Sequence, residues 1–235
     1  KPYVESPSAA DNVVGADAFQ KIALQAAREC LVLLKNEGAL LPLNAKALKR
    51  VAVIGPNADS TACMPTHYGP RAFKSVTVLK GIRAELEGSG VEVAYAKGCD
   101  HVNPGWPDSE LIPEPLSQKE RAGIDEAVAL AKGSDVAIVV LGDSGRTSGE
   151  SKTRNSLNLP GRQDDLLRAV QATGKPVVLV LLHGRPPAVN FAAKHVPAIL
   201  AGGYPGGHGG TAIAEALFGK YNPGGKTNGT WLRSA

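Results

Sequence analysis

The sequence predicts an α/β protein, a three-layer α/β/α sandwich around a mainly parallel sheet. Short runs of consecutive apolar residues recur along the 235-residue chain, each with the length of a buried strand. Segments with apolar residues at helical spacing lie between these runs. Turns rich in Gly and Pro separate the two kinds of segment. Strands that alternate with helices in this way form parallel sheets with helices on both faces.

The first helix is expected to begin at Asp17 and to end near 36–38. Asp17 followed by Gln20 resembles an N-terminal capping box, and Gly38 is a typical stop signal. Apolar side chains recur along this segment at helical spacing, and they are Phe19, Ile22, Ala23, Ala26, Cys30 and Leu33. The preceding residues show no periodic pattern. We therefore expect an irregular segment over 1–16 and a single domain over 17–235.

The remaining elements follow in alternation. Strands are expected at the apolar runs 51–55, 91–98, 135–142, 175–182 and 197–203. Helices are expected where apolar residues recur at helical spacing, at 76–88, 160–172 and 208–218. A further helix should open at the capping box formed by Ser117 and Glu120. Ligands bind beyond the carboxyl ends of such strands, so the loops to search are 56–75, 99–116, 142–159 and 183–188.

The composition excludes several classes of protein. With 43% hydrophobic and 20% charged residues, the chain is typical of a globular protein. The net charge of +4 comes from dispersed Lys and Arg without a basic run, so no nucleic-acid partner is expected. No stretch approaches the roughly 18 continuous apolar residues of a membrane span, so no membrane partner is expected.

Cysteine and histidine give no sign of a metal or a cofactor. The three cysteines, Cys30, Cys63 and Cys99, lack metal-ligand spacing and cannot all pair within one chain, so we expect free thiols. The five histidines lack the H-E-x-x-H pattern or a comparable spacing. No metal and no cofactor are therefore expected.

Two other kinds of site suit the fold class but lack their motifs. A dinucleotide site needs G-x-G-x-x-G, and a P-loop ends in G-K-[ST]; the segment 53–59 offers one glycine followed by a proline. The segment 203–211 is glycine-rich and precedes a helix, so anion binding by its amides is left as an alternative. Ser144 and Ser148 do not stand in the G-x-S-x-G elbow of a serine hydrolase.

The loop after the 135–142 strand has the most reactive content. Residues 142–154 read GDSGRTSGESKTR, with the two carboxylates Asp143 and Glu150 and three cations. Glycoside hydrolysis needs two carboxyl groups, one of them a general acid that protonates the leaving oxygen. Glu150 stands on a glycine-flanked loop that a sugar can reach. From position alone, a solvated loop glutamate without a chemical role is the simpler interpretation.

Six blocks of sequence carry a family resemblance. They are LLKNEGALLPL (33–43), VAVIGPNAD (51–59), SDVAIVVLG (134–142), GESKTRNSLNLPGRQ (149–163), KPVVLVLLHGRP (175–186) and YPGGHGGTAIAEALFGKYNPGGK (204–226). In this order they resemble the second domain of glycoside hydrolase family 3, an α/β sandwich that follows a barrel, and the match covers most of 18–226. Gly203 and His208 depart from the pattern, which usually has an aromatic residue and Glu or Gln there.

The resemblance implies part of a retaining glycosidase that removes terminal β-linked glucose or xylose from an oligosaccharide or a glucoside. In that family an aspartate on the barrel attacks the anomeric carbon. A glutamate in the block G-E-x-x-x-R-x-x-L-x-L-P is the acid/base in many members, and the same block here contains Glu150. The barrel motif is absent, so 1–16 is expected to be a linker after an N-terminal barrel domain, and the chain alone should be inactive. The resemblance also favours a periplasmic or secreted enzyme.

The surroundings of Glu150 must meet one condition. A general acid that works near neutral pH needs a raised pKa, which neighbouring cations lower. Glu150 must therefore point away from at least two of its three neighbours in the loop, Arg146, Lys152 and Arg154.

Two aromatic residues are candidates for binding the substrate. The apolar faces of sugars stack on aromatic rings, and Tyr68 and Trp106 stand in two of the candidate loops. A ring that covers the edge of the core is the alternative for each. At the level of the whole domain, the alternatives to a catalytic role are a carbohydrate-binding or scaffold domain and a nucleotide-binding α/β domain.

Overall fold

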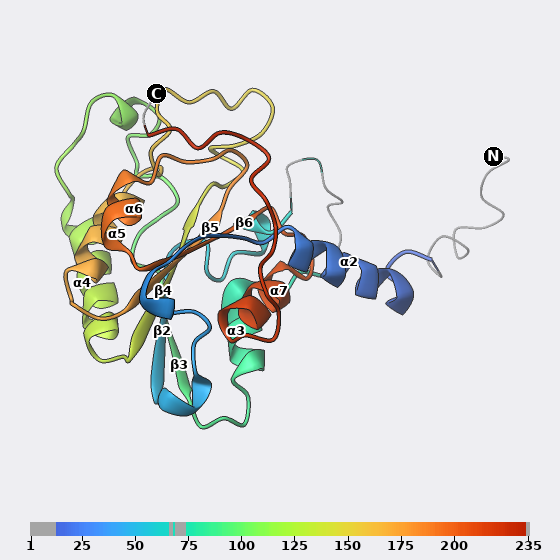
Figure 1. Cartoon of the computed structure of the whole chain (residues 1–235). Coiled ribbons are helices and arrows are strands. Elements are labelled where there is room, and N and C mark those ends of the chain that lie inside the picture. Colours follow the sequence, from blue (N-terminus) through green and yellow to red (C-terminus); the bar gives the residue numbers. More distant parts are fainter. Residues whose placement is uncertain (1–12, 66–67, 69–73, 234–235) are drawn as a thin grey trace, which may run out of the picture.

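The computed structural model describes residues 13–65, 68 and 74–233. Most of the predicted linker, residues 1–12, lies outside the described residues. The described part folds around one sheet with helices on both faces, as Figure 1 shows.

Six strands of the described chain form a single sheet in the order β1-β6-β5-β4-β2-β3. Their bounds are β1 (Val32–Asn36), β2 (Arg50–Ile54), β3 (Glu92–Ala96), β4 (Val136–Gly142), β5 (Val177–Leu182) and β6 (Ala198–Gly203). The strands β2 to β6 are parallel, and β1 pairs antiparallel with β6 at one edge. The predicted fold class, a three-layer sandwich with a mainly parallel sheet, is confirmed.

The helices form the two outer layers of the sandwich (Figure 1). One face of the sheet carries α2 (Asp17–Glu29), α3 (Val78–Glu85) and α7 (Gly209–Leu217). The other face carries α4 (Gln118–Lys132), α5 (Gln163–Gln171) and α6 (Asn190–His195). Helix α6 was not predicted from the sequence, and it is only six residues long. No helix in the described ranges has both the length and the apolar character needed to cross a bilayer.

The central strand β4 divides its side chains between the two layers. Every second residue, Val136, Ile138 and Val140, packs in the core beneath α3 and α7. The alternate residues Ala137, Val139 and Leu141 pack in the core beneath α4 and α5. All seven residues of the strand are buried. Burying one such aliphatic side chain contributes about 1.5–3 kcal/mol, which explains why strands buried on both faces read as continuous apolar runs.

The predicted capping box at the start of α4 is confirmed. The backbone amide of Glu120 donates to Ser117 Oγ at 3.2 Å, and the backbone amide of Ser117 donates to Glu120 Oε2 at 2.8 Å. These two bonds satisfy amides that otherwise lack partners at a helix start.

The predicted end of the first helix is wrong. Helix α2 ends at Glu29, and the apolar run Val32–Asn36 is strand β1, in which Val32 pairs with Ala201 of β6. A short apolar run fits a helix and a strand equally well. The open edge of β6 decides here, because pairing with it satisfies the backbone groups of both strands.

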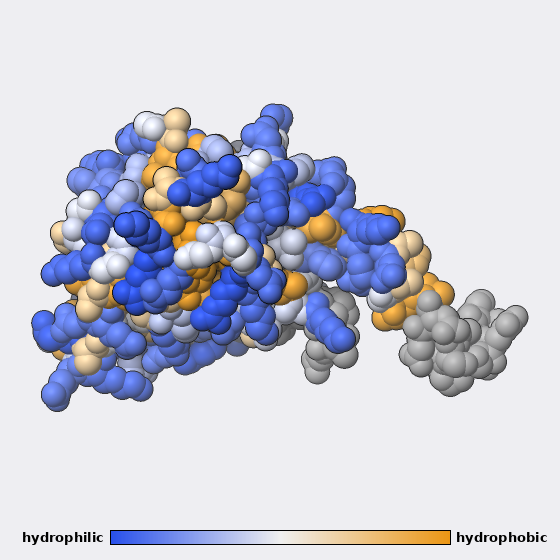
Figure 2. Space-filling model, turned by 90° about the horizontal axis from the view of Figure 1, so that it is seen from below, coloured by the Kyte–Doolittle hydropathy of each residue, from blue (hydrophilic) through white to orange (hydrophobic). Residues whose placement is uncertain are grey.

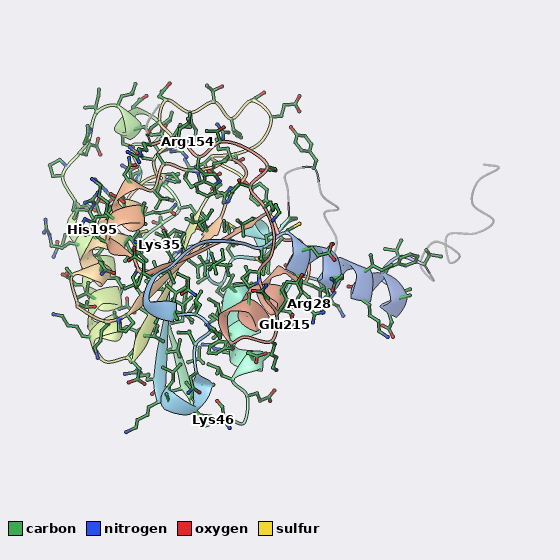
Figure 3. The ribbon with its side chains drawn as sticks, in the orientation of Figure 1. Arg28, Lys35, Lys46, Arg154, His195 and Glu215 are labelled. Carbon is green, nitrogen blue, oxygen red and sulfur yellow. The ribbon has the colours of Figure 1, made fainter. Side chains whose placement is uncertain are left out.

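Most of the apolar face of α2 faces outward. Phe19 and Ile22 are 53% and 64% exposed, and the same exposed face continues with Ala23, Ala26 and Cys30. Figure 2 shows apolar surface on this helix where it projects from the body of the molecule. The buried side is anchored by Ala27 and by the ion pair between Arg28 and Glu215, whose side chains face each other in Figure 3.

The strand order reverses between β2 and β4, which singles out this place on the carboxyl edge of the sheet. From β2 the chain moves to β3 on one side and then returns to β4 on the other side of β2. The loop that leaves β2 therefore leads to α3 on one face of the sheet, and the loop that leaves β4 leads to α5 on the other face. Ligands of open α/β sheets bind at such a reversal of strand order.

Candidate active site

The candidate site lies at this reversal, where the loops after β2 and β4 leave the sheet together. Asn57 Nδ2, on the first loop, donates to the carbonyl oxygen of Asp143, on the second, at 2.8 Å. Gly142 turns the chain out of β4 with φ 138°, and a Cβ there would lie 1.8 Å from the carbonyl oxygen of Leu182. Only glycine fits this exit, because it combines a left-handed φ with no room for a side chain.

The Asp143 carboxylate organises the first half of the loop that follows β4. It is 3% exposed and accepts hydrogen bonds from Thr147 Oγ1 at 2.8 Å and from the backbone amide of Gly184 at 3.0 Å. The hydroxyl of Thr147 in turn accepts a bond from the backbone amide of Ser144 at 3.0 Å. Residues 143–148 thus form a compact turn with its polar groups satisfied.

Arg154 holds the second half of the same loop. Its Nε donates to Glu110 Oε1 at 2.8 Å, its Nη2 donates to the carbonyl oxygen of Asn158 at 2.7 Å, and its Nη1 lies 3.7 Å from Asp143 Oδ1. The side chains of Arg154, Asp143 and Glu110 are only 3–5% exposed. Figure 3 shows Arg154 among the loops beyond the carboxyl edge of the sheet. Two buried carboxylates and one guanidinium therefore tie together the loops after β3 and β4.

Glu150 stands at the tip between these two anchored halves. The backbone amide of Lys152 donates to the carbonyl oxygen of Gly149 at 3.2 Å, which closes a tight turn around Glu150 and Ser151. Gly149 and Ser151, on either side of Glu150, have φ values of 133° and 59°. The Glu150 side chain is exposed, and it makes no hydrogen bond or ion pair with the rest of the described chain. Its carboxylate is thus available to a ligand in front of the turn.

The cations of the loop have other partners. Arg154 is bound to Glu110 and Asp143, and the guanidinium of Arg146 lies 5.7 Å from the centroid of the Trp106 ring. Lys152 is half-buried and forms no ion pair with a described residue. Two of the three cations near Glu150 in sequence therefore contact other side chains.

The two candidate aromatic residues differ in their surroundings. Trp106 is half-buried, and its indole Nε1 is buried without a hydrogen-bond partner among the described residues. Its contact with Arg146 brings the loop after β3 beside the loop that carries Glu150. Tyr68 is 70% exposed on the loop after β2. Their roles in substrate binding stay predictions.

Several residues that support the turn could not be identified from the sequence. Ser148 packs so closely on Gly184 that a Cβ on this glycine would lie 2.1 Å from Ser148 Oγ. The adjacent Tyr204 is partly buried, which raises the pKa of its phenol, and a hydrogen bond with Ser148 opposes that rise. Asp143 was visible in the sequence as a carboxylate directly after an apolar strand. Glu110 and Gly184 had no signal, because their importance depends on loops from other strands.

The described residues offer no alternative site of the kinds considered from the sequence. Within them, no cluster of His, Cys, Asp and Glu is able to hold a metal ion. The glycine-rich start of α7 is packed against the preceding loop, since a Cβ on Gly210 would lie 2.1 Å from the carbonyl oxygen of Thr77. The backbone amides of Gly209 and Gly210 already donate to the carbonyl oxygens of Gly206 and Val76, so these two amides are not free to bind an anion.

The three cysteines are free, as predicted. Burial raises the pKa of the Cys99 thiol to about 12 and also raises the pKa of Cys63. Cys63 Sγ lies 3.3 Å from His101 Nε2, and burial lowers the pKa of this histidine. A protonated thiol beside a neutral imidazole is a poor nucleophile, so the pair belongs to the packing of the loops.

The comparison with protein families finds one match. Residues 31–235 match the model described as the glycosyl hydrolase family 3 C-terminal domain. A periplasmic β-glucosidase of Salmonella typhimurium is 41% identical over 222 residues, which are 92% of this chain and 29% of that protein. A β-xylosidase of Formosa agariphila is 37% identical over 218 residues, which are 90% of this chain and 28% of that protein. The chain thus spans less than a third of the length of these relatives.

Solved structures agree with this match. A β-glucosidase from Erythrobacter marinus superimposes with a TM-score of 0.84 at 37% identity, over 97% of this chain and 32% of that one. A β-glucosidase from Listeria innocua in complex with isofagomine superimposes with a TM-score of 0.78 at 27% identity, over 94% of this chain and 28% of that one.

Proposed function

Because the chain belongs to glycoside hydrolase family 3, as its C-terminal domain, we propose that it supplies the general acid/base of a retaining β-glycosidase. Glu150 is the residue we assign to this role. The nucleophile comes from an N-terminal barrel domain, and the active site forms where the two domains meet.

The chemistry of the role has two steps. Glu150 first donates its proton to the glycosidic oxygen as the bond to the leaving group breaks and the nucleophile attacks the anomeric carbon. The resulting carboxylate then accepts a proton from the water that hydrolyses the glycosyl-enzyme. Retention requires the two carboxyl groups to lie about 5–5.5 Å apart, so Glu150 must reach across the domain boundary. An exposed side chain at the tip of a turn suits that reach.

One observation supports the assignment above the others. The Glu150 carboxylate is exposed and unpaired in the described chain, although the surrounding loop is held by buried hydrogen bonds and ion pairs. A glutamate kept only for solubility does not need an anchored loop. An acid/base does, because proton transfer depends on a hydrogen-bond distance to the reacting oxygen.

The substrate we propose is a glucoside or xyloside with a terminal β-linked sugar, since the relatives are named as β-glucosidases and β-xylosidases. Tyr68 and Trp106 are the proposed sugar-stacking residues. We also propose an exported enzyme, because one relative is named as periplasmic.

Replacement of Glu150 by Ala in the full-length enzyme tests the role. Without the acid, kcat/KM for glycosides with poor leaving groups should fall by about 10²–10⁴-fold. Aryl glycosides with strongly acidic phenols need no protonation, so formation of the glycosyl-enzyme from them should be nearly unchanged. Azide attacks the glycosyl-enzyme without a general base, and it should restore turnover of these activated substrates as the β-glycosyl azide.

The matched control is Glu87→Ala. Glu87 is also an exposed glutamate in a turn, but this turn precedes β3 and lies at the opposite edge of the sheet. The control should behave like the unmodified enzyme. Equal losses with good and poor leaving groups in Glu150→Ala, without rescue by azide, would exclude the acid/base role and favour a binding or scaffold domain.

A further inference from the structure

One short segment supports the Glu150 loop at its beginning, middle and end. This segment is 183–188, directly after β5. Near its start, the backbone amide of Gly184 donates to Asp143 Oδ2 at 3.0 Å. At its end, the backbone amide of Ala188 donates to the carbonyl oxygen of Leu157 at 2.7 Å. The loop therefore lies along this segment for its whole length.

Arg185 makes the central contact between the segment and the loop. Its Nη2 donates to the carbonyl oxygen of Lys152 at 2.9 Å and to that of Thr147 at 3.3 Å. These two carbonyl groups stand immediately before and after the four residues 148–151. A single guanidinium nitrogen thus closes the base of the turn that presents Glu150.

The guanidinium of Arg185 binds the carbonyl oxygens of Thr147 and Lys152 and no carboxylate of the described chain. Arg185 is half-buried and forms no ion pair with a carboxylate in the ranges that the structure describes. Hydrogen bonds from a charged donor are stronger than neutral ones, and the planar fork of arginine loses little conformational freedom when it binds. The two prolines that follow, Pro186 and Pro187, restrict the backbone that carries it.

The turn around Glu150 needs stabilising contacts from outside it. Ser151 has φ 59°, a left-handed value that costs free energy for any residue other than glycine, and the single turn hydrogen bond joins Gly149 and Lys152. Strained turns persist only where their surroundings enforce them. Arg185 stabilises the turn around Glu150 through its hydrogen bonds to the carbonyl oxygens of Thr147 and Lys152.

We propose that Arg185 is a positioning residue that orients Glu150 for proton transfer. Its guanidinium fixes the separation of the two limbs of the turn, and thereby the direction in which the Glu150 carboxyl group points. Arg185 itself does not touch the reacting atoms. The inference rests on the acid/base role proposed above for Glu150.

The test compares Arg185→Ala, Arg185→Lys and Glu150→Ala in the full-length enzyme. Misplacing an acid weakens proton transfer more than binding, so Arg185→Ala should lower kcat for poor leaving groups by roughly tenfold to a hundredfold. KM and the rate with activated aryl glycosides should change little. Lysine donates to one or both carbonyl groups, so Arg185→Lys should be intermediate, and added guanidinium should partly restore Arg185→Ala.

The decisive variant is the double substitution of Arg185 and Glu150 by Ala. If Arg185 acts only through Glu150, the double variant should be no slower than Glu150→Ala alone, because coupled residues are not additive. Arg162→Ala is the matched control. Arg162 also binds backbone carbonyl groups, those of Glu114 and Pro115, but it holds a different loop. It should show no dependence on the leaving group.

Hydrogen exchange supplies a readout independent of catalysis. The Lys152 amide, which closes the turn, should exchange at least roughly tenfold faster in Arg185→Ala and not in Arg162→Ala, since exchange follows local opening.

Four results would overturn the inference. Equal losses for all leaving groups would indicate a general effect on folding, and a raised KM alone would indicate a contact with the substrate. Additive losses in the double variant, with a leaving-group effect in Glu150→Ala, would reject Arg185 while the role of Glu150 stands. If Glu150→Ala shows no leaving-group effect, the proposed function itself fails and the positioning role fails with it.

Discussion

At the scale of single residues, the buried charges beneath the Glu150 loop are the most consequential feature. Arg154 lies between Glu110 and Asp143, and all three side chains are nearly inaccessible. Taking such charges out of water costs free energy that only a complete set of partners offsets. The loop that carries Glu150 therefore depends on a cluster in which the loss of one member strongly lowers the free energy of unfolding.

Replacing Glu110 by Ala should lower the free energy of unfolding by about 3–5 kcal/mol, because it removes the closer partner of a buried guanidinium. Urea denaturation measures this change. The matched control is Asp100→Ala, which breaks the exposed ion pair with Lys97; such surface pairs contribute about 1 kcal/mol or less. Similar values for the two variants would contradict the buried cluster.

At the scale of elements, α2 shows how a helix is held by its less hydrophobic side. Ala27 is 3% exposed, and the bidentate bonds from Arg28 to Glu215, at 2.6 and 2.7 Å, tie α2 to α7. The larger apolar residues Phe19 and Ile22 face away from the sheet. Hydrophobic periodicity alone identified the helix but not the side that packs.

This arrangement predicts effects of very different size for two substitutions in α2. Ala27→Asp places an unpaired charge in the core and should cost about 3 kcal/mol or more. Ile22→Ser changes an exposed position and should alter the free energy of unfolding by about 0.5 kcal/mol or less. Urea denaturation of the purified chain compares them. A large loss for Ile22→Ser would show that the outer face is covered in solution.

At the scale of the whole molecule, two histidines link stability to pH. Burial lowers the pKa of His183 and of His101, although the nearby Asp143 opposes the effect at His183. An unfolded histidine titrates near pH 6.5. Below that pH the unfolded chain binds protons that the folded chain does not, so falling pH favours unfolding.

The purified chain should therefore lose stability as the pH falls from about 7.5 to about 5.5, a window above the titration of ordinary carboxylates. The melting temperature at a series of pH values measures the loss. His183→Gln removes one of the two groups and should make the curve flatter. A melting temperature that is constant or rises across this window in the unmodified chain would contradict the pKa directions.

The fold was largely predictable from local patterns, but the partners of the charged side chains were not. Each of the five predicted strands is present, and the helix opened by Ser117 and Glu120 starts where its capping box predicted. Glu150 was identified through a motif resemblance. The sequence suggested Arg154 only as a neighbour that would lower the pKa of Glu150, whereas the structure pairs it with Glu110 on another loop.

Hydrophobic periodicity, capping and the order of the motif blocks determined from the sequence alone that this is a family 3 α/β sandwich with a glutamate after its third predicted strand. These signals depend on residues that are close together in the sequence, so they can be recognised without the structure. Only the tertiary structure decided that Val32–Asn36 is an edge strand, which side of α2 is buried, and that Arg185 closes the turn around Glu150. Each of these depends on a partner distant in the chain, because folding chooses among contacts that neighbouring residues cannot specify.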